Sequence, residues 1–292
     1  IDILVGSGSA EADAKDRDAI FGLNAVTTYN ITQDAGGNLV SGGEDLVFSS
    51  VENLYAGTAD DIFNFYGTPA NVSMTGQVYG GAGYDIFDYQ ANSYSAPVTF
   101  NLERESVTNI YGDQDDGMNG IEEFRGGTSA NDTIIGQNQE NTWNVGTVAH
   151  GDDSGQVSNV LETDLFIYVE NLDGGTDQDI FFLRDDLGVR GYIHGNGDTD
   201  EIDYSDYNGA GSTVAVDLTA GTATNVDAGI ATIENVTGGQ EDDIIRGDAG
   251  NNVLIGLTGA DFIRGEAGDD FIVGGADDDI LRGGTGDDVY HF

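Results

Sequence analysis

The chain has 292 residues, of which 53 are Asp or Glu and nine are Lys or Arg, giving a formal charge of −44. This charge excludes binding to nucleic acid and attraction to acidic membranes, and a folded protein that carries it needs cations to limit its self-repulsion. The 45 glycines indicate many tight turns, and the absence of cysteine excludes disulfides and thiolate metal sites, which leaves oxygen-rich sites suited to calcium or magnesium.

The first segment, residues 1–21, is expected to be the tail of a preceding repeat followed by an insert. Asp2-Ile-Leu-Val-Gly6 resembles the end of such a repeat, and residues 10–21 are the best helix candidate in the chain. Because residue 1 is Ile and no signal peptide is visible, we expect a processed chain or an excised fragment. No apolar run reaches the roughly 18 residues of a membrane span, so direct membrane insertion is not expected.

Residues 22–135 and 136–246 are predicted to be two copies of one degenerate module of about 115 residues. The segments that recur are Asp18–Gly22 with Asp132–Gly136, Val51–Phe63 with Val169–Phe181, Gly80–Tyr89 with Gly195–Tyr204, and Ile121–Gly127 with Ile233–Gly239. Alternating stretches such as Val98-Thr-Phe-Asn-Leu predict strands. We expect an all-β solenoid, and a β-sandwich built from residues 20–237 is the alternative.

Each module contains acidic residues at positions that match across the repeats. Asp61, Asp85, Asp132, Asp179 and Asp200 are candidate metal ligands, and the alternative is that each only caps a turn. An Ile/Val-Glu-Asn tripeptide recurs, with Glu52-Asn53, Glu170-Asn171 and Glu234-Asn235 as its Glu-Asn pairs and Glu122-Glu123 as a variant. These residues either add oxygen ligands or, as we favour, place Asn in a hydrogen-bonded ladder between coils and Glu in solvent.

Residues 238–292 form a regular array of six nonapeptides, each beginning with glycine. The sixth position is occupied by Asp243, Asn252, Asp261, Asp270, Asp279 and Asp288, and the eighth by Ile245, Leu254, Ile263, Ile272, Leu281 and Tyr290. A unit of six turn residues and a three-residue strand is too small to bury its own apolar side chain. Successive units must therefore stack, with the side chain of the eighth residue pointing inward. Two nonapeptides make one coil of about 18 residues. Asp243, Asp261 and Asp279 then share one edge, and the other three share the opposite edge.

This array resembles the repeats-in-toxin (RTX) family of calcium-binding nonapeptides, G-G-x-G-x-D-x-U-x. The resemblance implies a right-handed parallel β-roll with several Ca²⁺ ions in its turns, type I secretion by Gram-negative bacteria, and folding outside the cell. Glu241 and Asp277 depart from the pattern at the fourth position, Asp248, Leu257 and Glu266 depart from it at the second, and Asn252 is a neutral ligand. The modules resemble those of large bacterial adhesin-like surface proteins.

No catalytic constellation is visible, so we expect a protein that is not an enzyme. His150, His194 and His291 share no metal-ligand spacing, and neither H-E-x-x-H nor G-x-S-x-G occurs. Asp153-Ser154-Gly155 resembles half of an aspartic protease site, but it occurs once and turn chemistry explains it.

We therefore expect a secreted or cell-surface structural repeat protein that folds when calcium binds and serves as a stalk, adhesin, surface layer or filament. Its expected partner is calcium, and head-to-tail self-association and a cell-surface glycan are further candidates. The alternatives are a non-catalytic accessory module of a secreted protease, lipase or polysaccharide-modifying enzyme, and calcium-mediated glycan binding.

Overall fold

The protein is built from strands. The computed structural model describes residues 3–5, 19–21, 27–33, 39–41, 53–55, 60–65, 78–90, 94–108, 110, 118–146, 153–159, 163–184, 187–207 and 213–291. These residues contain no helix, and so none that is long and apolar enough to cross a membrane. The helix expected over residues 10–21 is wrong at its end, because Ala19–Phe21 is strand β2 and pairs in parallel with β1 (Ile3–Val5). Residues 10–18 lie outside the described residues.

The chain forms two compact units, of which the first contains residues 1–135 and 164–169. Its strands pair in three groups. The first group is β1, β2, β5 (Asn53–Tyr55), β7 (Val78–Tyr79) and β11 (Met118–Asn119); the second is β4 (Leu39–Ser41), β3 (Thr27–Gln33), β6 (Asp61–Phe65), β8 (Ile86–Asp88), β12 (Glu123–Arg125) and β16 (Thr163–Ile167); the third is β10 (Ser106–Val107), β9 (Thr99–Asn101) and β13 (Thr133–Ile135). All these pairs are parallel except β3 with β4 and β9 with β10.

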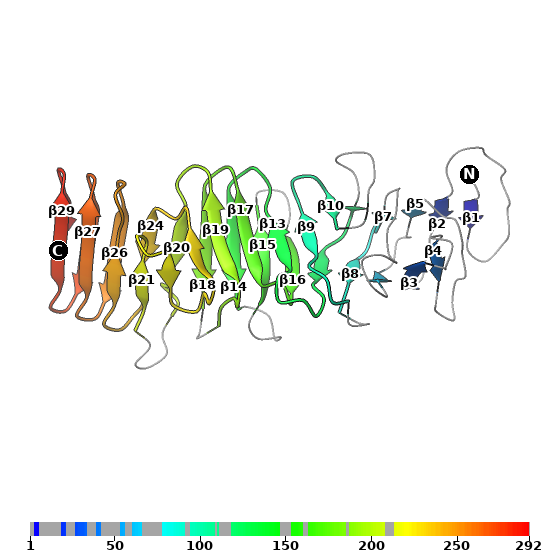
Figure 1. Cartoon of the computed structure of the whole chain (residues 1–292), viewed down its shortest axis with the longest axis horizontal. Helices are drawn as coiled ribbons and strands as arrows, with labels where there is room; N and C mark the ends of the chain where they lie inside the picture. Colours follow the sequence, from blue (N-terminus) through cyan, green and yellow to red (C-terminus); the bar gives the residue numbers. More distant parts are fainter. Residues whose placement is uncertain are drawn as a thin grey trace. The chain divides into compact units, whose positions relative to one another are not determined.

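The second unit contains residues 136–163 and 170–292 and also has three groups of strands (Figure 1). The groups are β17 (Asn171–Gly175), β19 (Tyr192–Asn196) and β23 (Gly229–Ala231); β22 (Thr222–Ala223), β21 (Ala215–Asp217), β25 (Ile244–Arg246), β27 (Phe262–Ala267) and β29 (Ile280–Thr285); and β15 (Ser154–Ser158), β14 (Asn141–Val145), β18 (Asp179–Leu183), β20 (Glu201–Asp203), β24 (Asn235–Thr237), β26 (Val253–Thr258), β28 (Phe271–Ala276) and β30 (Val289–His291). Only β14 with β15 and β21 with β22 are antiparallel.

Parallel pairing between successive coils identifies each unit as a β-solenoid and rules out the β-sandwich. In the first unit Phe63, Phe87 and Phe124 stand opposite one another in register, and their buried rings meet edge to face. In the second unit Trp143 stands opposite Phe181 in register, and these two buried rings are stacked. Each coil therefore adds one large inward side chain to a stacked core, which a single coil could not bury.

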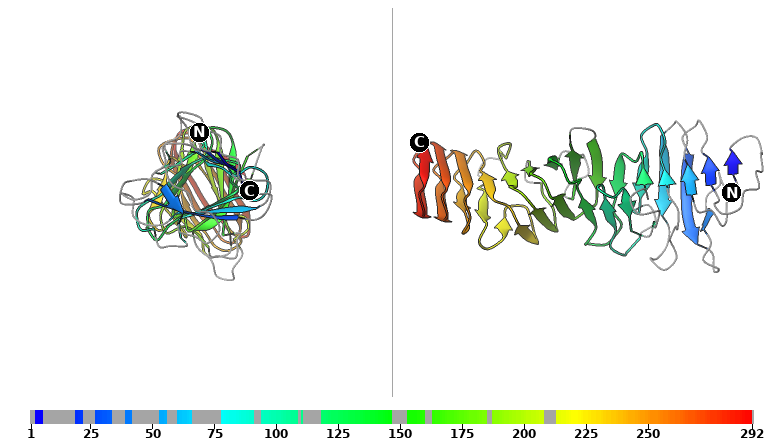
Figure 2. Two further views of the ribbon diagram at one scale, coloured as in Figure 1. Left: turned by 90° about the vertical axis from the view of Figure 1, so that its right-hand side faces the viewer. Right: turned by 90° about the horizontal axis from the view of Figure 1, so that it is seen from above.

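The C-terminal coils form a regular parallel β-roll, as predicted. Residues 18 positions apart pair in register, for example Leu254 with Ile272 and Ile245 with Ile263, and all four of these eighth-position side chains are fully buried. The strands of these coils lie next to one another in the orange and red part of Figure 2. The eighth-position Tyr290 is 40% exposed, on the last strand described. The limits of segments 1–21, 22–135, 136–246 and 238–292 stay a prediction.

Candidate metal centres

The sixth-position side chains of the array form two hydrogen-bonded ladders, one along each edge of the roll. In the first ladder the backbone N–H of Asp243 donates to Oδ1 of Asp261 at 2.9 Å, and that of Asp261 donates to Oδ1 of Asp279 at 3.0 Å. The second ladder joins Asn252, Asp270 and Asp288 in the same way, at 2.9 and 3.2 Å. Each bond spans 18 residues, so each ladder contains the residues that the nonapeptide spacing assigns to one edge.

The central carboxylates of these ladders lie inside the stack of turns. Asp261 is 1% exposed and Asp270 is 2% exposed. A β-carbon at Gly256 would collide with Oδ2 of Asp261, and one at Gly265 would collide with Oδ2 of Asp270. Glycine is therefore required at the first position of each of these nonapeptides, because a side chain there would collide with the carboxylate five residues later.

One oxygen of each of these two carboxylates has no hydrogen-bond partner among the described residues. The Oδ1 atoms belong to the ladders, whereas the buried Oδ2 atoms of Asp261 and Asp270 accept no hydrogen bond. Burial raises the pKa of Asp261 to about 6, against the opposing backbone hydrogen bond from Asp243. A buried, uncompensated charge is costly, so it must be neutralised by a proton or by a cation. A carboxylate oxygen held in a turn of carbonyl groups is a donor that calcium prefers.

Backbone carbonyl groups would have to provide most of the other ligands. No three Asp, Glu or His side chains converge on one point anywhere in the described part of the chain. The backbone is left-handed at the second and fourth turn positions, with φ of 81° at Leu257 and 116° at Gly259. The Leu257 carbonyl oxygen closely approaches Gly275 in the next coil. Calcium takes about six to eight oxygens, which stacked turns of this kind can provide together with the aspartates.

The last two nonapeptides repeat this geometry. In the turns that lead to Asp279 and Asp288 the second and fourth residues again have positive φ, including 83° at Asp277 and 133° at Gly286. A β-carbon at the first glycine of either turn would again collide with the aspartate carboxylate. The repeat pattern has glycine at the position of Asp277. Asp277 adopts the same left-handed backbone conformation, although it carries a side chain.

The first aspartate of the array has a different environment. Asp243 accepts the backbone N–H of Val214 through Oδ1 at 2.8 Å and that of Gly239 through Oδ2 at 2.6 Å. Neither Gly239 nor Glu241 has a positive φ. Both carboxylate oxygens of Asp243 are therefore used by the backbone, and the turn lacks the conformation of the later repeats.

Asn252 also differs from the later ladder residues. Its Oδ1 atom accepts the backbone N–H of Asp248 at 3.0 Å, and its Nδ2 donates to the carbonyl oxygen of Glu234 at 2.8 Å. Asp248, at the second turn position, has no positive φ. An amide fits this position because it must donate as well as accept, whereas a carboxylate can only accept.

The two modules place matching aspartates in equivalent ladders. The backbone N–H of Asp61 donates to Oδ1 of Asp85 at 2.7 Å in the first unit, and that of Asp179 donates to Oδ1 of Asp200 at 2.8 Å in the second. All four side chains are completely buried. The same bond therefore occurs in both copies of the duplicated sequence, although the bonded residues are 24 apart in one and 21 apart in the other.

Asp132 resembles Asp243 rather than Asp261. Its Oδ1 atom accepts the backbone N–H of Val98 at 2.8 Å and its Oδ2 atom accepts that of Gly127 at 2.6 Å. Burial raises its pKa to about 6 in spite of these bonds. Both oxygens of Asp132 are satisfied, so its environment is that of a turn cap.

Asp179 accepts hydrogen bonds from Asn141 through one of its two carboxylate oxygens. Its Oδ1 atom accepts the amide of Asn141 at 2.7 Å and the backbone N–H of the same residue at 3.0 Å. Burial raises the pKa of Asp179 to about 7, while the hydrogen bonds from Asn141 oppose this rise. Its buried Oδ2 atom accepts no hydrogen bond among the described residues.

The Asn residues of the recurring tripeptide bridge coils, as expected. Oδ1 of Asn171 accepts the backbone N–H of Tyr192 at 3.2 Å, and Oδ1 of Asn235 accepts that of Val253 at 2.9 Å. In both cases the donor belongs to the next coil, so the amide links neighbouring strands.

The prediction that the Glu residues of the tripeptide lie in solvent is wrong. Oε2 of Glu122 accepts the backbone N–H of Asp85 at 2.7 Å, and Oε2 of Glu234 accepts that of Asp200 at 2.9 Å. Glu170 is 2% exposed. The next coil has no sixth-position Asp at these places, so the longer Glu side chain reaches the ladder N–H instead. Glu52 lies outside the described residues.

Within the Asp-Ser-Gly segment, the aspartate makes contacts that stabilise the fold. Asp153 is fully buried, accepts the backbone N–H of Arg190 at 2.6 Å and forms an ion pair with the guanidinium of the same residue. Of the histidines, His194 stacks on Tyr192, His291 is exposed, and His150 lies outside the described residues.

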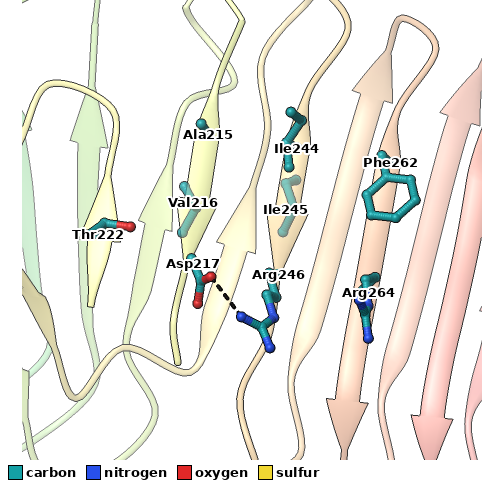
Figure 3. Close-up of a pocket in the computed structure, with 9 residues that line it drawn as sticks. All are labelled: Ala215, Val216, Asp217, Thr222, Ile244, Ile245, Arg246, Phe262 and Arg264. Carbon is teal, nitrogen blue, oxygen red and sulfur yellow. Dashed lines mark hydrogen bonds and ion pairs between the residues drawn. The ribbon is translucent and has the colours of Figure 1, made fainter. Parts of the chain in front are cut away.

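A groove of about 370 Å³ lies over β21, β25 and β27 (Figure 3). Its lining combines apolar side chains, such as the 53% exposed Ile244, with Arg246 and Arg264. Arg246 forms an ion pair with Asp217 at 3.0 Å, and Oε1 of Glu266 lies 2.6 Å from Arg246 and 3.1 Å from Arg264. The groove is therefore a mixed apolar and charged surface beside the ladders.

Comparison with protein families gives one match. The model of the RTX calcium-binding nonapeptide repeat, which covers four copies, matches residues 229–263 and 255–290. A search of curated proteins found no match. The matched residues include the ladder residues from Asp243 to Asp288 and none of the five module aspartates.

Proposed function

Residues 229–290 match the RTX calcium-binding nonapeptide repeat, and on this premise we propose that the chain is an extracellular structural protein that completes its fold when calcium binds. RTX repeats bind calcium, and RTX proteins are typically secreted. The role as a stalk, adhesin, surface layer or filament is our proposal, as is the absence of catalysis.

The observation that carries this proposal is the row of buried carboxylates whose Oδ2 atoms lack partners. Asp261 and Asp270 each hold the neighbouring coil through Oδ1 and leave Oδ2 for a cation. Without calcium, the −44 formal charge opposes closure of the coils. At a concentration of 100 times its dissociation constant, each independent ion would stabilise the fold by about 2.7 kcal/mol. A few such ions equal the usual stability of a domain, about 5–15 kcal/mol.

The test is a calcium titration of the full chain followed by circular dichroism. We expect the β signal of the array to appear on addition of calcium and to be lost when EGTA is added in excess. Magnesium at the same concentration should restore much less of it, because magnesium keeps its waters and demands a stricter geometry. Full β signal in excess EGTA would contradict the proposal.

Electron microscopy distinguishes the structural roles from one another. Filaments or sheets that form only with calcium would support assembly from successive copies. Single particles at every calcium concentration would favour a spacer, or the accessory module of a secreted enzyme.

A glycan-binding role is the second candidate, and the groove supports it. Arginine forms bidentate hydrogen bonds with carboxylates, and an exposed apolar surface beside it can pack against a sugar ring. We would screen an acidic glycan array with and without calcium, using wild type and Arg264→Ala. Calcium-dependent binding that the variant loses would support this role, and equal binding by both proteins would exclude the groove.

A further inference from the structure

We infer that the protein holds a divalent, oxygen-preferring cation at two more places, the turns 80–85 and 195–200. Both turns lie outside the residues that match the RTX repeats. The inference rests on the proposed calcium-dependent function and extends it to one site in each of the two units.

The carboxylates that end these turns match those of the regular array. Asp85 and Asp200 are completely buried, and their Oδ2 atoms have no hydrogen-bond partner among the described residues. Their Oδ1 atoms belong to the ladders, like those of Asp261 and Asp270. A β-carbon at the first glycine of either turn would approach Oδ2 too closely, as in the array.

The backbone of these turns matches that of the array as well. The second and fourth residues of turn 80–85 have φ of 101° and 136°, at Gly81 and Gly83. In turn 195–200 the same positions are Asn196 and Asp198, with φ of 79° and 64°. Asn and Asp are the non-glycine residues that adopt this conformation most readily, so turn 195–200 keeps the backbone of the array without glycine at these two positions.

A second row of hydrogen bonds supports the comparison for turn 80–85. The backbone N–H of Tyr84, at the fifth position, donates to Oδ1 of Asp60 in the preceding coil at 2.9 Å. In the array the fifth-position N–H of Ala260 donates to Oδ1 of Asp242 at 2.8 Å in the same way. The turn therefore reproduces both rows of bonds that stack the calcium-binding repeats.

The charges around the two carboxylates also favour a cation. The charged groups that act most strongly on Asp85 are Glu122, Asp61 and Asp60, all of them acidic. Those acting on Asp200 are Asp179, Glu234 and Asp198, again all acidic. Each of these groups adds negative charge beside the carboxylate, which favours a bound cation.

The turn of Asp132 provides a matched control within the same chain. This aspartate is also completely buried, but backbone N–H groups use both of its oxygens and residues 127–131 have no positive φ. The geometry assigns no cation to it.

The experiment counts calcium ions on the full chain by equilibrium dialysis with metal analysis and by native mass spectrometry. Asp85→Asn and Asp200→Asn should each bind one ion fewer than wild type, and the double variant two fewer. Asp132→Asn should bind the wild-type number. Asp261→Asn is the positive control, because it changes a ligand of the matched array.

The outcomes separate this inference from the proposed function. If the double variant binds as many ions as wild type while Asp261→Asn binds fewer, the two sites are absent and the array still binds calcium. If neither variant changes the number, the proposed function fails as well. Where a variant does not fold, anomalous diffraction from terbium-soaked wild-type crystals decides: peaks at turns 80–85 and 195–200 support the sites, and peaks confined to the array overturn them.

Discussion

The Oδ1 atom of Asp261 accepts the backbone N–H of Asp243 at 2.9 Å, across one coil of 18 residues. Its Oδ2 atom is buried and accepts no hydrogen bond among the described residues. One carboxylate therefore holds two coils in register and offers an oxygen to a cation. Mutation can separate these two roles, because binding a cation needs the negative charge of the carboxylate, whereas holding the two coils in register does not.

Asp261→Asn should reduce calcium binding and leave the ladder intact. An amide oxygen can still accept the Asp243 N–H, but the group no longer carries a negative charge. We expect the calcium-dependent gain in unfolding free energy to fall by about 2.7 kcal/mol at a calcium concentration of 100 times the dissociation constant. Urea unfolding at a series of calcium concentrations at which the roll is folded measures this gain.

The matched control is Asp242→Asn. Asp242 is exposed, and its Oδ1 accepts the backbone N–H of Ala260 at 2.8 Å, a bond that Asn can keep. The formal charge changes equally in both variants. An equal loss of calcium stabilisation in both would mean that general charge, and not the buried oxygen, governs binding.

The calcium-free protein should be more stable in mild acid than at neutral pH. Burial raises the pKa of Asp179 and Asp200 to about 7 and that of Asp261 to about 6. The folded state therefore binds protons more tightly than the unfolded state does, and the stabilisation present at low pH is lost as the pH rises through about 6–7. Circular dichroism of the calcium-free chain at pH 5, 6, 7 and 8 should show this fall as a loss of β signal. Saturating calcium should weaken or reverse it, because protons and calcium compete for the same oxygens.

Gly256→Ala should destabilise the roll even in calcium. A β-carbon there would collide with Oδ2 of Asp261 and lie 2.6 Å from the carbonyl oxygen of Gly274. Overpacking of this kind costs roughly 1–3 kcal/mol. Gly250→Ala is the control, since the nearest atom to its β-carbon would be Oδ1 of Asp248 at 3.3 Å and its φ is not positive. Thermal unfolding of both variants in calcium should separate them, and equal melting temperatures would contradict the clash.

Asp277→Gly should stabilise the roll. Asp277 is exposed and has φ of 83°, a conformation that costs a non-glycine residue about 1–2 kcal/mol. Glycine removes this strain, so we expect a gain of about 1 kcal/mol in unfolding free energy, measured with urea in saturating calcium. The exposed Asp278 has no positive φ, so Asp278→Gly should instead lose about 0.5–1 kcal/mol through added chain entropy. A loss of stability in both variants would show that the Asp277 side chain contributes more than its strain costs.

Strict repetition made the array predictable. Because the nonapeptide period is constant, simple spacing assigns Asp261 and Asp279 to one edge and Asp270 and Asp288 to the other, and the two ladders agree with that assignment. The inward direction of Leu254 and Ile272 follows from the same period. Local sequence is sufficient here because every coil has the same neighbours.

The modules are different, because their coils have unequal lengths. The ladder bonds span 38 residues from Asn141 to Asp179, then 21 to Asp200, then 34 to Glu234. The chain forms β15, β16 and β17 between Asn141 and Asp179, whereas it forms β18 and β19 between Asp179 and Asp200. Spacing along the chain therefore does not indicate which residues meet. For the same reason the sequence alone does not show that the Glu residues of the tripeptide reach the ladder N–H groups.

The sequence by itself determined the fold class, the likeness to calcium-binding repeats and the two edges of the roll, because a glycine-rich period of nine with a strongly acidic composition permits few other structures. Only the tertiary structure decided which carboxylates keep an oxygen for a cation. Asp132 and Asp261 look alike in sequence, but the oxygens of the first are used by Gly127 and Val98. The second accepts one bond through Oδ1 and leaves Oδ2 unpartnered. That difference depends on which N–H groups the neighbouring coils bring near, and therefore on residues far away in the chain.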